Sequence, residues 1–430
     1  MNTKPHSVGM VVRTLVTGLG AAVTVTVAVV AMRMGETSTL EGRAGAGGSH
    51  ASGVVAAFER ESYSRGERAR LVIKDRSRRM LVQIFRSGPE HVVTSSDTVM
   101  NGIPVSREKT VTRRPGRYPL SVPVGRWESG LYFARLQSPD GRIGFAPFVL
   151  APRRVGARRV AVVFPTLTWQ AYNFRDDDGD GHPDSWYAGK RRNTVRLGRA
   201  HLDRGVPYGF RYHVGFLNWL EWTNKRADYL SQWDLEQVES SATLARAYDL
   251  IVFVGHHEYV TTQEYDLVEG YRDLGGNLMF LAANNYFWRV ERDGNVLEKS
   301  GRWRDLDRPE AALIGVQYVA YQRAPRGAWI ARKAPARSWL FAGTSLRPGS
   351  PFARGGVEID QITPDSPSEI QLVADIPNLF GPGKSAQMTY YETRAGARVF
   401  AAGAFHLARA AQSDPVVSRI LENLWARLTR

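Results

Sequence analysis

The sequence predicts an α/β fold with an open, mostly parallel sheet, preceded by an antiparallel β-sandwich. Two observations lead to this prediction. Short runs that alternate apolar and polar residues, separated by turn-forming residues, fill the region up to about residue 152, which is typical of antiparallel strands. Continuous apolar runs follow from about residue 156, which is typical of parallel strands buried on both faces.

The first predicted domain, the sandwich, covers residues 55–152. Its clearest strand candidates lie at 69–73, 80–85, 130–136 and 143–150. Turns rich in Gly, Pro, Ser and Asp separate these runs, at 64–67, 87–89 and 138–141. Because its sequence shows no grouping of catalytic residue types, we interpret the sandwich as a spacer or docking module.

The second predicted domain covers residues 156–430, and its buried strands are predicted at 159–164, 249–254 and 277–282. Before the last of these strands lies a helix that begins at the capping-box sequence Thr261–Glu264 and ends at Gly275 and Gly276. This arrangement is a βαβ unit, whose crossover is expected to be right-handed. A final helix is predicted over 415–428.

The N-terminal part of the chain precedes both domains. Residues 14–32 carry no charge and follow Lys4 and Arg13, which indicates a signal peptide or a membrane anchor within residues 1–35. Residues 42–53 are small and polar, and we interpret residues 36–54 as a flexible linker. Since the positive flank stays in the cytoplasm, we expect an extracytoplasmic protein, either secreted or anchored to the membrane by this single segment.

The composition excludes several kinds of chemistry. Without cysteine the chain has no thiol nucleophile, disulfide or Cys-ligated zinc site. Lys and Arg total 57 against 42 Asp and Glu, which gives a net charge of +15. The sequence shows no nucleic-acid-binding motif, so we interpret this charge as a solvated, arginine-rich surface and expect no nucleic-acid partner.

Polar residues cluster directly after the three predicted buried strands, at 166–173, 255–259 and 283–288. These segments read TLTWQAYN, GHHEY and ANNYFW. Ligands of open α/β sheets bind outside the carboxyl ends of the strands, so we expect the three segments to converge there. Two histidines and a glutamate directly after an apolar strand favour a functional site over a solvated turn.

These segments and their neighbours resemble the large (beta) subunit of N,N-dimethylformamidase and its relatives. The similar motifs occur in order: TWQAYN (168–173), DSWY (184–187), VPYGF (206–210), NWLEW (218–222), GHHEY (255–259), ANNYFWR (283–289), YYET (390–393) and RVFAAG (398–403). The sandwich, with WESGLY at 127–132, is similar to the sandwich that precedes the family's main domain. The resemblance implies a fold like that of class I glutamine amidotransferases.

The resemblance also implies a mononuclear iron held by two tyrosines and a glutamate. On this chain the glutamate is Glu258 and the first tyrosine is Tyr172. The second tyrosine is assigned to Tyr208, with Tyr187 as the alternative. The family has an Arg-Pro-Tyr run at this point, and this chain keeps only its proline and tyrosine, as Pro207 and Tyr208. The catalytic residues that the resemblance implies are His256, Asn284 and Glu392.

Such a set of residues suits amide hydrolysis. Phenolate and carboxylate oxygens are ligands that Fe(III) prefers. A metal bound by three anionic oxygens polarises an amide carbonyl and lowers the pKa of a bound water. Glu392 or His256 would then carry a proton to the departing amine, and Asn284 would hold the substrate carbonyl or the oxyanion.

A second metal site is predicted within the sequence DDDGDGHPD at 176–184. Positions 1, 3, 5, 7 and 9 of an EF-hand-type calcium loop are filled by Asp176, Asp178, Asp180, His182 through its backbone carbonyl, and Asp184. Position 12 is Tyr187, so the bidentate glutamate is missing and the segment resembles extracellular calcium repeats. We predict structural calcium here; a solvated acidic loop is the alternative.

These observations give one leading hypothesis for the function. We expect an extracytoplasmic, metal-dependent hydrolase of non-peptide amide (C–N) bonds, acting on a small molecule and associating with a small subunit or with further copies of itself. The alternative is a non-catalytic secreted or surface binding protein that keeps the fold. It is suggested by the missing arginine before Pro207, the added membrane segment and the added acidic loop.

Overall fold

A computed structural model of the chain describes residues 53–88, 99–187, 193–202 and 204–429. The predicted signal peptide or anchor, and all but the last two residues of the predicted linker, lie outside these ranges. Within the described ranges, no helix is long and apolar enough to cross a membrane.

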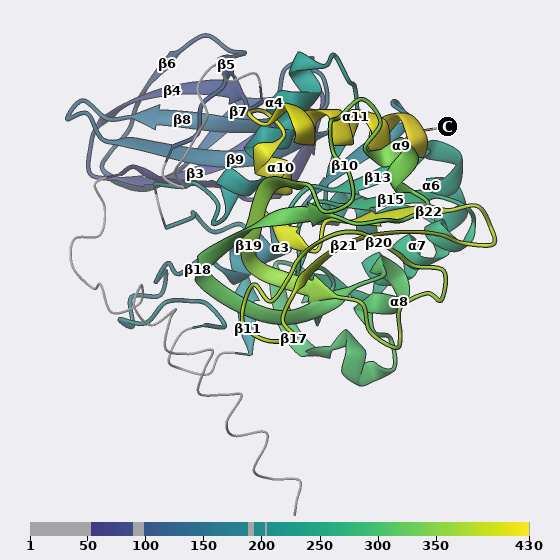
Figure 1. Cartoon of the computed structure of the whole chain (residues 1–430). Coiled ribbons are helices and arrows are strands. Elements are labelled where there is room, and N and C mark those ends of the chain that lie inside the picture. The colour runs from purple at the N-terminus through teal and green to yellow at the C-terminus, as the bar shows by residue number, and fades with distance from the viewer. Residues whose placement is uncertain (1–52, 89–98, 188–192, 203, 430) are drawn as a thin grey trace, which may run out of the picture. The chain divides into compact units, whose positions relative to one another are not determined.

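Two sheets near the N-terminus form the sandwich (Figure 1). The smaller sheet has the order β1-β3-β7 and contains β1 (Val55–Phe58), β3 (Arg68–Asp75) and β7 (Gly116–Pro123). The larger sheet has the order β2-β9-β8-β4-β5, with β6 paired to β4. It contains β2 (Ser62–Ser64), β4 (Arg79–Arg86), β5 (Ile103–Pro104), β6 (Lys109–Thr112), β8 (Gly130–Gln137) and β9 (Ile143–Ala151).

Side chains of β3 and β4 alternate between buried and more exposed positions, as their sequence pattern predicts, whereas β8 and β9 are buried over most of their length. Leu71 and Ile73 of β3 and Val82 and Ile84 of β4 enter one shared apolar core. The four predicted strands correspond to β3, β4, β8 and β9 and are confirmed. The pairings are antiparallel apart from β2 with β9, which is parallel.

The main sheet follows the sandwich and has ten strands, in the order β12-β10-β13-β15-β22-β21-β20-β18-β19-β23. Its first five strands are parallel to one another: β12 (Asp228–Ser231), β10 (Val160–Phe164), β13 (Leu250–Phe253), β15 (Asn277–Phe280) and β22 (Arg398–Ala401). The three predicted buried strands are β10, β13 and β15, so this part of the prediction is confirmed.

The second half of the main sheet is antiparallel, which the sequence did not reveal. It consists of β21 (Ala386–Glu392), β20 (Gln371–Ile376), β18 (Gln317–Ala331), β19 (Pro351–Gln361) and β23 (Ala404–Phe405). The sheet is therefore mixed, with a parallel half and an antiparallel half. The likeness to class I glutamine amidotransferases stays a prediction, as do the boundaries between the predicted domains.

Helices and loops cover both faces of the parallel half (Figure 1). Val160, Val162 and Phe164 of β10 face an apolar core shared with α4 (Val214–Trp222) and α11 (Pro415–Leu428). Ala161 and Val163 face a second core, shared with α6 (Ser241–Ala247) and α7 (Thr262–Asp273). Burial on both faces explains why β10 is a continuous apolar run. The predicted last helix is confirmed as α11, which begins at the N-cap Asp414.

Helix α7 confirms the predicted helix and half of the predicted capping box. The Thr261 side chain accepts a hydrogen bond from the Glu264 backbone N–H at 3.2 Å. The Glu264 carboxyl is fully buried and accepts instead from Gln232 Nε2 at 2.7 Å and from the Tyr286 hydroxyl at 3.2 Å. This side chain therefore ties α7 to the loop after β15.

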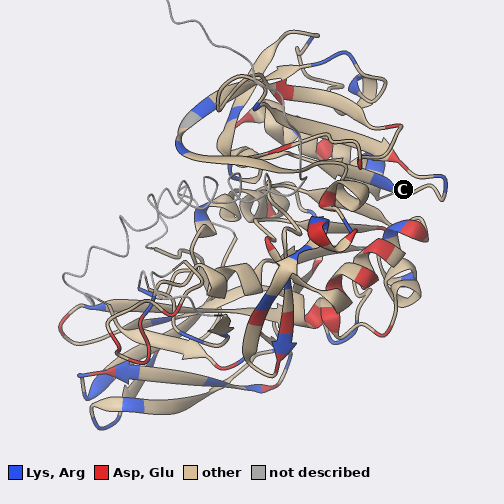
Figure 2. Cartoon of the chain, turned by 90° about the horizontal axis from the view of Figure 1, so that it is seen from below, with Lys and Arg blue, Asp and Glu red and all other residues tan. Residues whose placement is uncertain are grey.

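A four-stranded sheet borders the carboxyl end of the parallel half. It has the order β11-β17-β16-β14 and contains β11 (Thr194–Arg196), β17 (Val296–Arg302), β16 (Trp288–Asp293) and β14 (Tyr259–Thr261). Strand β14 starts at the last residue of GHHEY and runs parallel to β16, so it holds that segment in place. Figure 2 shows basic and acidic residues interspersed over both the sheets and the helices.

Candidate functional site

The three polar segments converge at the carboxyl edge of β10, β13 and β15, as expected. The segment after β10 forms the short helix α3 (Thr166–Ala171), which leads into Tyr172. Thr168 Oγ1 accepts a hydrogen bond from the Glu258 backbone N–H at 3.1 Å. Asn285 Oδ1 accepts from the His257 backbone N–H at 3.0 Å. The loop after β13 is thus held from both neighbouring segments.

A group of phenol, carboxylate and imidazole side chains lies at this meeting point. We call it the phenol cluster, and it consists of Tyr172, Tyr187, His256, Glu258, Tyr259 and Glu358. The Tyr187 hydroxyl lies 2.9 Å from the Tyr172 hydroxyl, 3.1 Å from Glu258 Oε1 and 2.5 Å from the Tyr259 hydroxyl. Three phenols and a carboxylate therefore meet around one oxygen atom.

Burial decides the protonation of this cluster. Burial, reinforced by the Glu258 carboxylate, raises the pKa of Tyr172, Tyr187 and Tyr259 well above the usual value for a phenol. The three hydroxyls consequently keep their protons at neutral pH, and they donate them to one another and to Glu258. A cation that entered the cluster would have to displace such protons.

His256 contributes a buried imidazole to the cluster. Burial lowers its pKa to about 3, so the imidazole is neutral at pH 7. Its Nε2 atom lies 3.2 Å from Glu358 Oε2 and 3.5 Å from Glu258 Oε2, and neither contact has the alignment of a hydrogen bond. The backbone of Asn284 hydrogen-bonds to the ring and fixes its orientation.

The two candidates for the second tyrosine occupy different places. The Tyr208 ring stacks on the Tyr172 ring with 5.2 Å between centroids and an interplanar angle of 12°. The Tyr187 ring also stacks on Tyr172, at 4.6 Å, and its hydroxyl in addition reaches Glu258. The Tyr187 hydroxyl, from the alternative assignment, thus lies within hydrogen-bond distance of both Tyr172 and Glu258.

Asn284 lies in the loop after β15 with a φ of 53°, in the left-handed region. Its backbone N–H donates to Asp360 Oδ1 at 2.8 Å, which holds this loop against β19. Burial raises the pKa of Asp360 to about 7. The Oδ1 atom of Asn284 is buried without a hydrogen-bond partner among the described residues, so it is available to a bound molecule.

The structure places Glu392 away from the phenol cluster, so its predicted catalytic role stays a prediction. It lies exposed at the end of β21, where it accepts from the Tyr390 hydroxyl and from Arg427 Nη2 at 3.0 Å. Strand β21 runs antiparallel to β22, so its carboxyl end points to the opposite edge of the sheet from the ends of β10, β13 and β15.

Glu358 is the carboxylate that the sequence reasoning missed. It lies near the end of β19. Four successive antiparallel pairings connect β22 to β19, so β19 runs in the same direction as the parallel strands. A signal was present in the sequence: Glu358 and Asp360 alternate in a run that is otherwise apolar, which is unusual for a buried strand.

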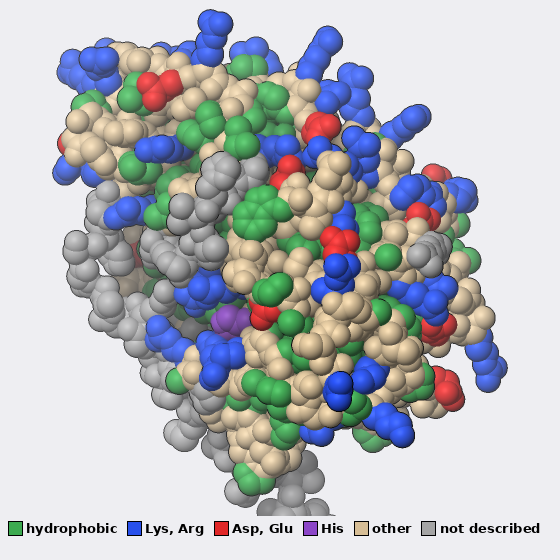
Figure 3. Space-filling view, turned by 45° about the horizontal axis from the view of Figure 1, so that its top comes forward, with side chains coloured by type: hydrophobic (Ala, Val, Ile, Leu, Met, Phe, Trp, Pro, Cys, Tyr) green, Lys and Arg blue, Asp and Glu red, His purple; other side chains and the backbone are tan. Residues whose placement is uncertain are grey.

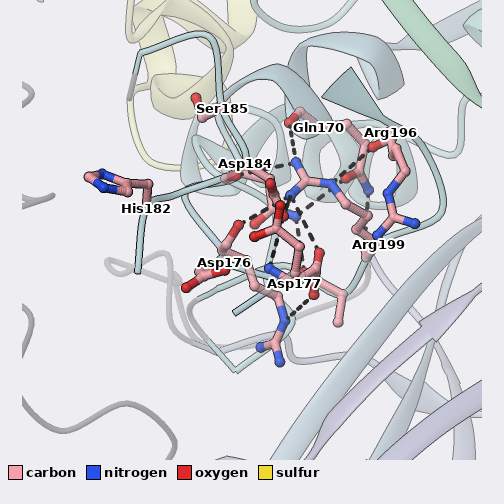
Figure 4. A network of polar contacts seen from close by, with 12 residues as sticks. Gln170, Asp176, Asp177, His182, Asp184, Ser185, Arg196 and Arg199 are labelled. Atoms are coloured by element: carbon pink, nitrogen blue, oxygen red, sulfur yellow. Dashed lines mark hydrogen bonds and ion pairs between the residues drawn. The ribbon is translucent and has the colours of Figure 1, made fainter. Parts of the chain in front are cut away.

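The acidic loop, residues 176–184, brings part of the predicted calcium set together. Carboxylate oxygens of Asp176, Asp178 and Asp184 lie within 4.8 Å of one another and could hold a metal ion. Asp180 Oδ1 accepts from the His182 backbone N–H at 2.8 Å. The His182 side chain points away from Asp176 and Asp184 (Figure 4), and the predicted role of its backbone carbonyl stays a prediction.

A buried arginine ties the acidic loop to the rest of the protein (Figure 4). Arg199 is 6% exposed and lies 3.4 Å from Asp177 and 3.9 Å from Asp184, and its guanidinium also donates to the Gln170 carbonyl at 3.1 Å. After the loop, Ser185 Oγ donates to the Ala171 carbonyl at 2.8 Å. These bonds place the loop beside α3 and so position Tyr187 against Tyr172.

Comparison with known proteins gives a match over most of the chain. The family model described as "N,N-dimethylformamidase beta subunit-like, C-terminal" matches residues 60–415. The N,N-dimethylformamidase beta subunit of Alcaligenes sp is 26% identical over 212 residues, which cover 40% of this chain and 27% of that protein. The same subunit of Paracoccus aminophilus is 26% identical over 211 residues, with the same two shares. The match thus spans about a quarter of each relative.

A comparison with solved structures gives matches of low TM-score. A superoxide reductase (neelaredoxin) from Ignicoccus hospitalis shares 8% identity, covers 24% of this chain and 82% of its own, and has a TM-score of 0.16. An overlap of this size carries no argument about this chain.

Proposed function

Because this chain belongs to the N,N-dimethylformamidase beta subunit-like family, we propose that it hydrolyses the C–N bond of a small amide at the phenol cluster. One observation carries the proposal. The Tyr187 hydroxyl lies within hydrogen-bond distance of both the Tyr172 hydroxyl and the Glu258 carboxylate, and the neutral His256 lies beside that carboxylate. Oxygen donors and a base therefore meet at the sheet edge where ligands of such folds bind.

The residues of the cluster fit an iron ion. The Tyr187 hydroxyl lies 2.9 Å from the Tyr172 hydroxyl and 3.1 Å from Glu258 Oε1 in a buried site, and phenolate and carboxylate oxygens suit Fe(III). We therefore propose these three residues as ligands, with Tyr187 in place of Tyr208. A bound iron would supply Lewis acidity toward an amide carbonyl and toward water.

The other side chains have distinct parts in the proposed reaction. The neutral Nε2 of His256 accepts a proton from water, and Glu358, 3.2 Å away, stabilises the imidazolium that results. The same proton is then available to the departing amine. The unsatisfied Oδ1 of Asn284 accepts a hydrogen bond from the substrate or from water, and thereby orients it.

The remaining proposals concern the protein's surroundings. We propose that the acidic loop binds calcium through Asp176, Asp178 and Asp184, which would hold Tyr187 in place from outside the cluster. We also propose that the protein acts outside the cytoplasm. The relatives are named as beta subunits, so we propose a smaller subunit or a second copy of this chain as its partner.

The test combines metal analysis with turnover. The purified chain, expressed with iron supplied, is expected to hold close to one iron, to show a visible charge-transfer band, and to release amine from at least one of a panel of small amides that includes N,N-dimethylformamide. Tyr172→Phe and Tyr187→Phe should remove the band, while Tyr208→Phe and Tyr390→Phe should keep it.

Two results would decide against the proposal. Iron below about a tenth of an equivalent, where a resident ligand set predicts near-full loading, would count against the metal site. Full iron loading without turnover of any amide would favour the alternative, a binding protein that keeps the family fold. Loss of the band in Tyr208→Phe and its retention in Tyr187→Phe would restore the first assignment.

A further inference from the structure

Lys and Arg side chains are more frequent than Asp and Glu on the face of the molecule that Figure 3 shows. Seven Lys and Arg side chains line a cavity of about 280 Å³. It lies between the sandwich and the parallel half of the main sheet, which both belong to the unit of residues 47–430. Its volume is close to the lower limit for small-molecule sites, roughly 300 Å³, and such sites are frequent where domains meet.

Three segments supply the cationic lining of this cavity, which we call the arginine cavity. The sandwich contributes Arg65 and Arg86, and the stretch after α4 contributes Lys225 and Arg226. The connection between β9 and β10 contributes three further guanidinium groups, from Arg153, Arg154 and Arg158. Of the 17 lining residues, seven are cationic and three are carboxylates. Positive charge is therefore far more concentrated here than in the whole chain, which carries +15 over 430 residues.

Two of the three carboxylates pair with particular cations, and the third, Asp228, is hydrogen-bonded to a backbone N–H and to a phenol. Glu221, at the end of α4, pairs with Arg86 and lies 3.7 Å from Arg226. Glu128 lies 3.8 Å from both Arg158 and Arg226. Asp228 is 1% exposed and accepts from the Arg158 backbone N–H and the Tyr248 hydroxyl, each at 3.2 Å. These contacts hold Arg86, Arg158 and Arg226 in place.

Three guanidinium groups of the lining, those of Arg65, Arg153 and Arg154, remain to be considered together with Lys225. Lys225 is neutralised by Glu422 of α11 at 2.7 Å. Arg65 donates only to the Trp127 carbonyl at 3.0 Å, and within the described part of the chain Arg65, Arg153 and Arg154 belong to no ion pair. Their charges are therefore available to a molecule that enters the cavity.

We propose that the arginine cavity binds a small phosphate monoester. A phosphate monoester has three terminal oxygens and close to two negative charges, and guanidinium groups match such oxygens in shape and charge. Three uncommitted guanidinium groups can therefore contact one phosphate group. The Trp127 side chain lines the same cavity and offers an apolar surface for the organic part of the ester. This binding is independent of the phenol cluster and of amide hydrolysis.

The experiment is a calorimetric titration of the full chain at constant ionic strength with inorganic phosphate, glucose 6-phosphate, glucose and succinate. We expect saturable binding of inorganic phosphate and of glucose 6-phosphate, weaker binding of succinate, and none of glucose. The double variant R153Q/R154Q should weaken the binding of glucose 6-phosphate by at least about tenfold, since each charged hydrogen bond contributes substantially to affinity. Both arginines are exposed, so the variant is expected to fold.

A matched control is R113Q/R114Q, which removes another exposed pair of adjacent arginines from the sandwich but lies outside the cavity. It should bind like the wild type. The proposal is overturned if glucose 6-phosphate shows no saturable binding, if succinate binds more tightly than inorganic phosphate, or if R153Q/R154Q and the control weaken binding equally. The last result would mean that any surface arginine contributes through general charge alone.

Discussion

The phenol cluster and the acidic loop are neighbours in the sequence, since Tyr172 and Tyr187 flank residues 176–184, yet their oxygen atoms lie in opposite surroundings. In the cluster, burial keeps the phenols of Tyr172 and Tyr187 protonated. In the loop, Asp178 and Asp180 are exposed and satisfy backbone N–H groups of the loop itself. A cation in the cluster must replace protons, whereas a cation in the loop need only replace water.

The cluster and the loop also differ in the chemical groups that they contain. The cluster contains a base and an unsatisfied acceptor nearby, at His256 and Asn284, so it has what a reaction requires. The loop offers carboxylates alone, and its bonds to α3 position Tyr187. Four predictions follow from this difference, beginning with the largest expected effect.

The largest effect is expected from the carboxylate beside His256. Glu358→Gln should lower kcat/KM for the best amide substrate by about 100-fold or more, because a proton-transfer partner contributes at least that much. Its melting temperature should stay close to that of the wild type. Glu392→Gln, on the opposite edge of the sheet, should stay within about twofold of the wild-type rate. The reverse outcome would return the catalytic role to Glu392.

The second prediction concerns the pH dependence of iron binding. The pKa values of Tyr172 and Tyr187 are raised, so each phenol loses one proton when it binds iron, and affinity must rise with pH. Two protons correspond to about a hundredfold gain in affinity per pH unit between pH 6 and 8, measured by competition with a chelator. Tyr187→Phe should reduce this gain to about tenfold, and Tyr208→Phe should leave it unchanged. An affinity that does not vary with pH would contradict the protonated cluster.

The third prediction concerns calcium at the acidic loop. Calcium at millimolar concentration should raise the melting temperature by a few degrees, since a ligand that binds only the folded state stabilises it. Asp176→Asn with Asp178→Asn should abolish this rise. The control, Asp293→Asn with Asp365→Asn, removes two exposed aspartates elsewhere and should keep it. A calcium response of wild-type size in the loop variant would show that the ion binds at another place.

The smallest effect is expected from Asp360, which supports the Asn284 loop. Burial raises its pKa from about 3.9 in the unfolded chain to about 7 in the fold, so the folded state retains a proton that the unfolded state has lost. Stability from this group is therefore lost as the pH rises from about 4 through 7. Relative to wild type, Asp360→Asn should gain a few degrees of melting temperature between pH 5 and pH 8. The exposed variant Asp365→Asn should show a constant difference.

Those parts of the site that follow parallel strands could be predicted from the sequence. Tyr172, His256 and Asn284 each come shortly after a continuous apolar run, and parallel strands end at one edge of a sheet. Their convergence needed only the positions of the runs. The last helix was equally accessible, because the cap Asp414 and the apolar spacing that follows are local features.

The rest depended on non-local pairing. The directions of β19 and β21 decide whether Glu358 or Glu392 reaches the cluster. These directions follow from the strand order of the sheet, which cannot be predicted from a local sequence pattern. Similarly, the choice between Tyr187 and Tyr208 depends on how the acidic loop folds back onto α3 through Arg199 and Ser185. The sequence contains all four residues but not the contacts that bring Tyr187 and Glu358 to the cluster.

The order of strands in the main sheet has a consequence for the synthesis of this protein. Strand β15 is complete at residue 280, but its partner β22 begins only at residue 398. Until then, an emerging chain presents one edge of β15 unpaired, with Leu278, Met279 and Phe280 among the most buried residues of the finished protein. An unpaired apolar edge is prone to join other chains. A chain released between the synthesis of these two strands would therefore be prone to aggregate, because the partner of β15 is still missing.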